Sequence, residues 1–237
     1  MRILITNDDG VGAEQLVPLI KWCRKLGEVT TFVPKFEQSG KSHGFEIHRP
    51  FEVKQVELEP GITVYTVDST PADCVRFAVL GMGLEFDLVI SGINRGLNIG
   101  ADMMYSGTVG AACEAVNLGF KAIALSTPPK YYDRAVEHLD QVFDYVFDRK
   151  LLDLNPIYNI NIPENPGQIR ITRQGGPYYS DTFPHVGNDL YRPTGYAVWK
   201  DSCDDTLDTD ATLHGYITVT PLTINKTNLD VYRELTK

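Results

Sequence analysis

Short runs of aliphatic and β-branched residues alternate along this chain with segments in which apolar residues recur every three or four positions. Such runs are typical of buried strands, and the longer spacing is typical of the helices that cover them. The run 2–6 is followed by a helical pattern through 16–26 and by a second run at 29–33. A strand, a helix and a strand in this order predict parallel pairing with a right-handed crossover.

The same alternation continues as far as residue 147. It predicts strands within 46–66, around a hairpin turn at 59–61, and further strands at 87–90 and 121–126. Helices are expected to start at Thr70, an N-cap followed by proline, and at Ser106, and a long amphipathic helix is expected over 135–147. This order of elements predicts an α/β fold with a mostly parallel sheet.

The C-terminal third has a different character. Strand-like segments at 158–162, 169–173 and 216–222 flank residues 177–215, which are rich in Gly, Pro, Asp and aromatic residues. A structureless loop of this length is unusual inside a compact domain. We therefore predict one domain over 1–237 in which 177–215 is an extended excursion, a hairpin that packs on another subunit.

The aromatic residues of this excursion allow two interpretations. They could stack on a nucleobase or anchor a subunit interface, and the second role is more common for aromatics on an arm. The residues concerned are Tyr178, Tyr179, Phe183, Tyr191, Tyr196 and Trp199.

Composition narrows the classes of partner. With 237 residues and a net charge of -9, the chain would repel a nucleic-acid polymer. No apolar run is long enough to span a bilayer, and a strand that starts at Arg2 leaves no room for a signal peptide. The four cysteines form no CxxC pair and are expected to be reduced and structural. We expect a cytoplasmic protein with no membrane partner.

Polar residues gather where three predicted strands end. These loops are Asn7-Asp8-Asp9-Gly10, Gln38-Ser39-Gly40 and the stretch from Ser91 to Asn98. Open α/β sheets bind ligands at this edge. The carboxylate, hydroxyl and carboxamide oxygens suit Mg²⁺, Mn²⁺ or Ca²⁺ better than zinc, for which the five histidines show no suitable spacing. The alternative is that Asp8 and Asp9 form a solvated turn or a helix cap, but three oxygen-rich loops at one edge favour a cation.

A second pattern, Tyr105-Ser106-Gly107-Thr108-Val109-Gly110, opens a helix. The free backbone amides there could bind an anion, although a serine before a helix is also an ordinary N-cap. The segment lacks the lysine of a Walker A loop, and no GxGxxG follows the first strand. A cation site beside an anion site predicts hydrolysis of a phosphomonoester.

Taken together, the motifs resemble the SurE survival-protein nucleotidases, and the resemblance extends over nearly the whole chain. The motifs are ITNDDG at the start, QSG at 38–40, STPADCV at 69–75, DLVISGINRGLNIG at 87–100, YSGTVGAA at 105–112, NINIP at 159–163, TRQGG at 172–176 and GYITVTPL at 215–222.

The resemblance implies a three-layer, Rossmann-like α/β fold with a protruding C-terminal arm, exchanged between the subunits of a homodimer or homotetramer. It implies a phosphatase that acts on nucleoside 5′- and 3′-monophosphates, with polyphosphate as a further substrate of some members. One Mg²⁺ or Mn²⁺ per subunit would be held by Asp8, Asp9, Ser39 and Asn94. Asp8, Asp9 and Asn94 would be catalytic. The phosphate would be bound by Asn98, Ser106, Gly107 and Thr108.

Two other functions compete with this one. A receiver-like phosphoaccepting domain also has an acidic pair after its first strand, but it needs a further Asp where this chain has Ser91-Gly92. A regulatory module that binds nucleotides without hydrolysing them would use the same ligands. Lys41 and Arg95 flank the predicted site and are not assigned a role.

Overall fold

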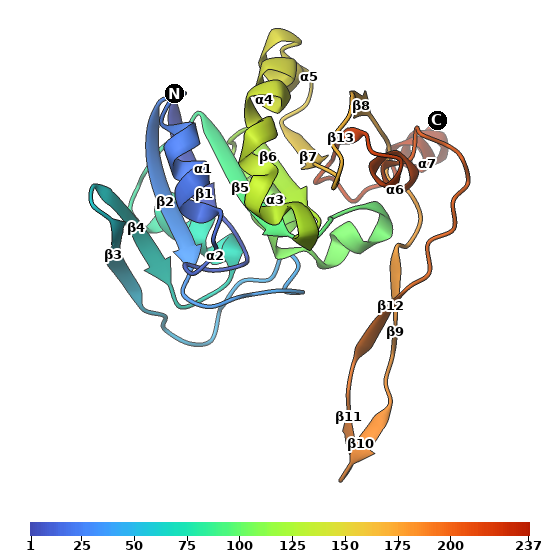
Figure 1. The fold of residues 1–237 in the computed structure, drawn as a ribbon, viewed down its shortest axis with the longest axis horizontal. Helices are drawn as coiled ribbons and strands as arrows, with labels where there is room; N and C mark the ends of the chain where they lie inside the picture. The colour runs from blue at the N-terminus through green and yellow to red at the C-terminus, as the bar shows by residue number, and fades with distance from the viewer.

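The computed structural model describes all residues from 1 to 237 and has a nine-stranded mixed sheet at its centre (Figure 1). The strands of this sheet are β1 (Arg2–Thr6), β2 (Glu28–Pro34), β3 (Val53–Glu59), β4 (Ile62–Val67), β5 (Leu88–Arg95), β6 (Ala122–Thr127), β7 (Ile157–Asn161), β8 (Ile169–Ile171) and β13 (Ile217–Pro221). They lie in the order β3-β4-β2-β1-β5-β6-β7-β13-β8. From β4 to β7 the pairing is parallel, whereas β3 pairs antiparallel with β4 and β13 with β7.

Helices and short helical turns cover the sheet and its edges. They are α1 (Leu16–Cys23), α2 (Pro71–Arg76), η1 (Phe77–Gly81), η2 (Gly100–Tyr105), α3 (Gly107–Asn117), η3 (Pro129–His138), α4 (Leu139–Asp148), α5 (Leu151–Leu154), α6 (Asp208–Leu213) and α7 (Leu229–Leu235). None of them is both long enough and apolar enough to cross a membrane.

The core is divided into two hydrophobic clusters, one on each face of the sheet. Ile3 and Ile5 of β1 pack in the larger cluster, with residues of α1, η3 and α4. Leu4 points to the opposite face and packs in the smaller cluster, with residues of α2 and α3. Successive side chains of a strand alternate between faces, so a fully apolar β1 serves both clusters. The predicted three-layer α/β fold with a mostly parallel sheet is confirmed.

Three predicted elements differ in their extent. Residues 46–52 are not part of a strand, and the hairpin starts at Val53. β5 continues to Arg95, so the predicted glycine-rich turn from Ser91 begins as strand, with an irregularity in its pairing to β6 between Ser91 and Asn94. The predicted helix over 135–147 is divided at Leu139 into η3 and α4.

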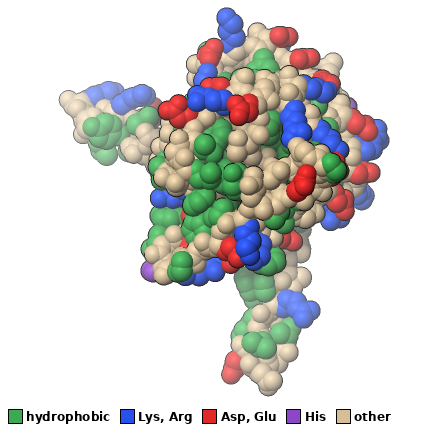
Figure 2. Space-filling model, turned by 90° about the vertical axis from the view of Figure 1, so that its left-hand side faces the viewer, with side chains coloured by type: hydrophobic (Ala, Val, Ile, Leu, Met, Phe, Trp, Pro, Cys, Tyr) green, Lys and Arg blue, Asp and Glu red, His purple; other side chains and the backbone are tan.

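The predicted excursion consists of two different parts. Residues 179–197 form a narrow two-stranded arm that leaves the body (Figure 1), built from β9 (Tyr179–Thr182), β10 (His185–Gly187), β11 (Leu190–Tyr191) and β12 (Thr194–Ala197). Figure 2 shows hydrophobic side chains on the arm where it extends below the body. By contrast, the chain returns to the body at α6, where five of the six residues are buried.

Candidate functional site

The site is centred on the turn that follows β1. Asn7 closes this turn, because its side chain donates to the Gly10 carbonyl (3.1 Å) and accepts from the Gly10 amide (3.0 Å). The turn presents Asp8, which is only 5% exposed, and Asp9, which is partly buried. Burial raises the pKa of Asp8. Burial and then the negative charge of Asp8 raise the pKa of Asp9 to about 6.

The loop after β2 is attached directly to this turn. The amide of Gln38 donates to the Asp8 carbonyl (2.7 Å), which places Ser39 beside the acidic pair. Ser39 is exposed, and its hydroxyl donates to the Glu37 carboxylate (2.6 Å). The charge of Glu37 adds to the rise in the pKa of both aspartates. Glu37 is therefore a member of the site that sequence reasoning missed, although it lies beside the QSG motif.

The end of β5 supplies the third loop. The Arg95 amide donates to Oδ2 of Asp9 (3.0 Å). This hydrogen bond brings Asn94, the preceding residue, close to the acidic pair. The Asn94 side-chain amide donates to the Gly96 carbonyl (2.8 Å), and its carbonyl oxygen accepts no hydrogen bond. The irregular pairing between Ser91 and Asn94 is of the kind that redirects side chains near functional sites.

The start of α3 contacts the same turn, although it lies about 100 residues further along the chain. The Thr108 hydroxyl donates to Oδ1 of Asp8 (2.5 Å). A Cβ atom on Gly107 would lie 3.0 Å from the Asp8 Cβ, so only glycine allows this approach without displacement. Ser106 caps the helix by accepting from the Val109 amide (3.1 Å). The helix end and its unpaired amides, which attract anions, therefore lie beside the two carboxylates.

Asn98 is placed in a separate buried network. Its side-chain amide donates to Ser126 (2.8 Å), and its backbone carbonyl accepts from the side chains of Asn159 (2.7 Å) and Asn161 (3.0 Å). It shares no hydrogen bond with Asp8, Asp9 or the start of α3. The structure thus unites the other predicted residues by direct or neighbouring contacts and gives Asn98 structural partners of its own.

Tyr132 lies close enough to Asp9 to be affected by its charge, and nothing in the sequence pointed to it. It is 4% exposed, and its hydroxyl has no hydrogen-bond partner. The Arg95 guanidinium lies 5.9 Å from its ring centroid. Burial, and then the charge of Asp9, raises the pKa of Tyr132, so its hydroxyl stays protonated and able to donate.

The donor set fits a hard divalent cation. Two partly or fully buried carboxylates have raised pKa values and form no ion pair, and Oδ1 of Asp9 accepts no hydrogen bond. No group of three or more His, Cys, Asp or Glu side chains is arranged to hold a metal. A cation here would therefore need the Ser39 hydroxyl, the Asn94 carbonyl and water to complete its shell.

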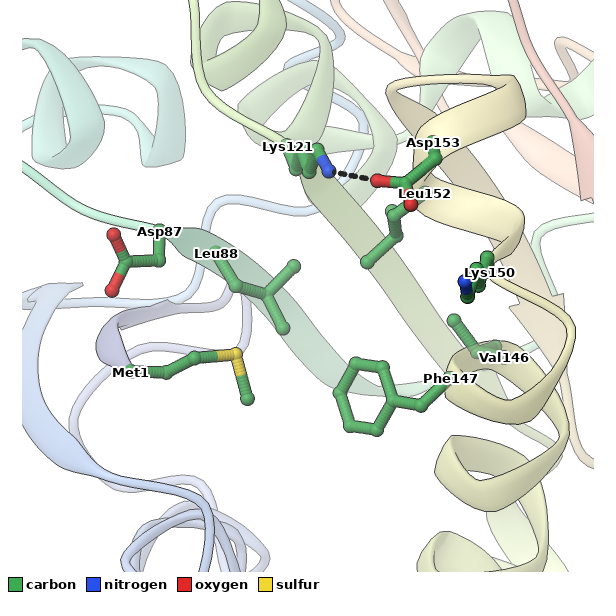
Figure 3. A pocket seen from close by; sticks show the side chains of 9 residues that line it. All are labelled: Met1, Asp87, Leu88, Lys121, Val146, Phe147, Lys150, Leu152 and Asp153. Atoms are coloured by element: carbon green, nitrogen blue, oxygen red, sulfur yellow. Dashed lines mark hydrogen bonds and ion pairs between the residues drawn. The ribbon is translucent and has the colours of Figure 1, made fainter.

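A cavity of about 270 Å³ lies at the opposite edge of the sheet, where β5 and β6 begin (Figure 3). Met1, Leu88 and Phe147 line it, and Lys121 forms an ion pair with Asp153 at 2.6 Å. It contains none of the predicted site residues. We therefore place the site at the Asp8–Asp9 turn and not in this cavity.

Comparisons with known proteins agree with the fold described above. The family model described as "Survival protein SurE" matches residues 3–181. The proteins named 5′-nucleotidase SurE from Thermosipho melanesiensis and Fervidobacterium nodosum are 34% and 36% identical to this chain, over 99% of this chain and 96% of each relative. The SurE protein from Aquifex aeolicus has a crystal structure that matches with a TM-score of 0.79 and 29% identity, over 100% of this chain and 98% of that one. The chain belongs to the SurE family.

Proposed function

We propose that the chain is a metal-dependent 5′-nucleotidase that hydrolyses nucleoside monophosphates to nucleoside and phosphate. The relatives named 5′-nucleotidase SurE support this activity. The observation that carries it is the contact of the acidic pair with the start of α3, through the Thr108–Asp8 hydrogen bond. A cation held by the aspartates and an anion bound at the start of α3 would then be within reach of one phosphoryl group. A purely regulatory nucleotide-binding module is the less favoured reading.

Asp8, Asp9, Ser39 and Asn94 would hold the cation, which we expect to be one Mg²⁺ or Mn²⁺ per subunit. When bound, such a cation supplies Lewis-acid stabilisation of the charge on the phosphoryl oxygens. The amides at the start of α3 orient the same oxygens. The positive end of the helix dipole stabilises their negative charge. Water attacks phosphorus, the bond to the ester oxygen breaks, and that oxygen leaves with a proton as the nucleoside hydroxyl.

Several residues support this reaction without holding the cation. Thr108 fixes the orientation of the Asp8 carboxylate, and the Arg95 amide does so for Asp9. Ser106 accepts from Val109 and keeps its own proton for a phosphoryl oxygen. Gly107 leaves the space above Asp8 open. We include Asn98 only as a support of the neighbouring backbone.

The finer features of the function are also proposals. We propose 3′-monophosphates as further substrates, and polyphosphate as a candidate to be tested alongside them. The exposed apolar residues of the arm support a homodimer or homotetramer. The four cysteines are unpaired, which supports a reducing, cytoplasmic location.

Release of inorganic phosphate tests the proposed function. The purified chain is incubated with adenosine 5′-monophosphate and with the 3′ isomer, in Mn²⁺, in Mg²⁺ and in excess chelator. We expect release with a metal and none with the chelator. Calorimetric binding of the nucleotide without any phosphate release would instead identify a regulatory module.

A further inference from the structure

Glu114 is a buried carboxylate that the proposed reaction does not use. It lies in the middle of α3 and is 3% exposed. It accepts hydrogen bonds from Nε2 of His43 (2.6 Å) and from the Arg76 guanidinium (2.8 Å). Burial raises the pKa of Glu114, but the hydrogen bonds from His43 and Arg76 outweigh this effect and hold the pKa below its ordinary value. The carboxylate is therefore charged, and it forms hydrogen bonds with both partners.

His43 belongs to a loop that is fastened to three helical elements. The Ser42 amide donates to the Tyr105 carbonyl (3.0 Å), and its hydroxyl donates to the Met104 carbonyl (2.6 Å), both in η2. The Arg76 guanidinium of α2 lies 4.6 Å from the ring centroid of Phe45. On α3, a Cβ atom on Gly110 would collide with the Ser42 carbonyl oxygen. The loop thus lies directly on the helix that carries Glu114.

The other end of this loop is fastened to the acidic turn. The Gln38 amide donates to the Asp8 carbonyl (2.7 Å). Between this contact and Ser42 lie only Ser39, Gly40 and Lys41, and all three are exposed. They have few contacts of their own, so their position depends on how firmly the two ends are held.

We propose that Glu114, acting through His43 and Arg76, is a positioning residue that holds the loop carrying Ser39 beside the site for the cation. The inference rests on the proposed function, because it assigns Ser39 to the cation. Residues that orient ligands from outside the coordination shell commonly change metal affinity by ten- to a hundredfold. Leaving a buried charge unpaired is costly. His43 is therefore a better residue to change than Glu114, because Arg76 still pairs with Glu114 when His43 is removed.

The test compares three variants of the full chain. His43→Ala removes the donor to Glu114, and His43→Gln retains a side-chain amide that can reach the same carboxylate. His48→Ala is the matched control, because His48 is an exposed histidine five residues away whose side chain makes no hydrogen bond. For each, Mn²⁺ affinity is measured by titration calorimetry and melting by circular dichroism. Tryptic cleavage of the Lys41–Ser42 bond is followed by mass spectrometry.

For His43→Ala we expect about a tenfold weaker Mn²⁺ affinity and faster cleavage after Lys41, with a melting temperature close to that of the wild type. His43→Gln should recover most of the affinity, and His48→Ala should match the wild type. Unchanged affinity and cleavage in His43→Ala would overturn the inference, as would a lower melting temperature with unchanged affinity. A wild type that cleaves no nucleotide in Mn²⁺ would overturn the proposed function instead, and the cleavage rates would still report whether His43 holds the loop.

Discussion

The Thr108 hydroxyl donates a 2.5 Å hydrogen bond to the Asp8 carboxylate across 100 positions of the sequence. This contact joins the first loop of the sheet to the start of α3. Hydrogen bonding to the charged form lowers the pKa of a carboxyl group, so Thr108 opposes the rise that burial causes in the pKa of Asp8. The hydroxyl thereby favours the ionised form that a cation requires.

Replacing Thr108 by Val keeps the shape and deletes the donor. We expect kcat/KM to fall by about tenfold or more, equivalent to roughly 1.4 kcal/mol of transition-state stabilisation. The resemblance assigns this hydroxyl to the phosphate, and its bond to Asp8 predicts that Mn²⁺ affinity also falls. Thr108→Ser, which restores a hydroxyl, should recover much of both values. Lower thermal stability with unchanged kinetics would reduce Thr108 to a structural role.

Replacing Asp9 by Asn should abolish phosphate release. The change removes one ligand charge, yet it also removes the repulsion between two neighbouring carboxylates. We therefore expect the metal-free variant to melt at or above the wild-type temperature at pH 8, and to gain no stability from Mn²⁺. Asp181→Asn, at an exposed position on the arm, is the control and should behave as the wild type. Full turnover by Asp9→Asn at limiting Mn²⁺ would exclude Asp9 as a ligand.

The raised pKa of Asp9, about 6 against an ordinary value of 3.8, predicts two dependences on pH. The folded protein holds this proton more tightly than the unfolded chain, so the contribution of Asp9 to stability falls as pH rises from about 4 to 6. A cation competes with the same proton, so Mn²⁺ affinity should weaken about tenfold per pH unit below pH 6.

The dependence of stability is measured by chemical denaturation of the metal-free proteins, as a difference between wild type and Asp9→Asn, because other carboxylates titrate in the same range. The dependence of Mn²⁺ affinity is measured on the wild type alone, by calorimetric titrations from pH 5 to 8. An Mn²⁺ affinity of the wild type that stays constant from pH 5 to 6 would contradict the assignment.

The arm joins the body through two adjacent chain segments. Val198 donates to the Tyr178 carbonyl (2.9 Å) at its base, so an Asn-Gly turn in place of residues 179–197 would join two adjacent ends. Apolar residues of the arm such as Phe183, Leu190 and Tyr191 are each 62% exposed. We expect the full chain to be a dimer or larger by light scattering and the shortened chain to be smaller, with nearly unchanged melting. A full-length monomer at micromolar concentration would contradict this.

The sequence by itself determined the parts of the protein that depend on local pattern. Ile3, Leu4 and Ile5 show that β1 is buried on both faces, and the βαβ order makes its neighbours parallel. Since the carboxyl ends of parallel strands meet at one edge, Asp8, Asp9, Ser39 and Asn94 could be assigned to one site before any contact was known. Their roles as ligands stay predictions.

Local pattern was misleading where polar residues are buried by distant partners. Asp208-Thr209-Asp210 reads as a loop, yet it opens a buried helix, because Asp208 accepts from the amides of Gly100 (3.0 Å) and Gly175 (2.7 Å). Asn98 is predicted from the sequence to bind the phosphate, and the structure adds a contact that the pattern does not show, the hydrogen bond from its side chain to Ser126.

Only the tertiary structure decided which groups contact the acidic pair. The Thr108 hydroxyl and the backbone amides of Arg95 and Gln38 reach it from three separate segments of the chain. Tyr132, whose pKa the charge of Asp9 raises, belongs to a fourth. The hydrogen bond between Glu114 and His43 joins residues that are 71 positions apart in the sequence. Such contacts depend on the packing of helices against both faces of the sheet, and packing leaves no spacing or motif in the chain from which a pair could be read.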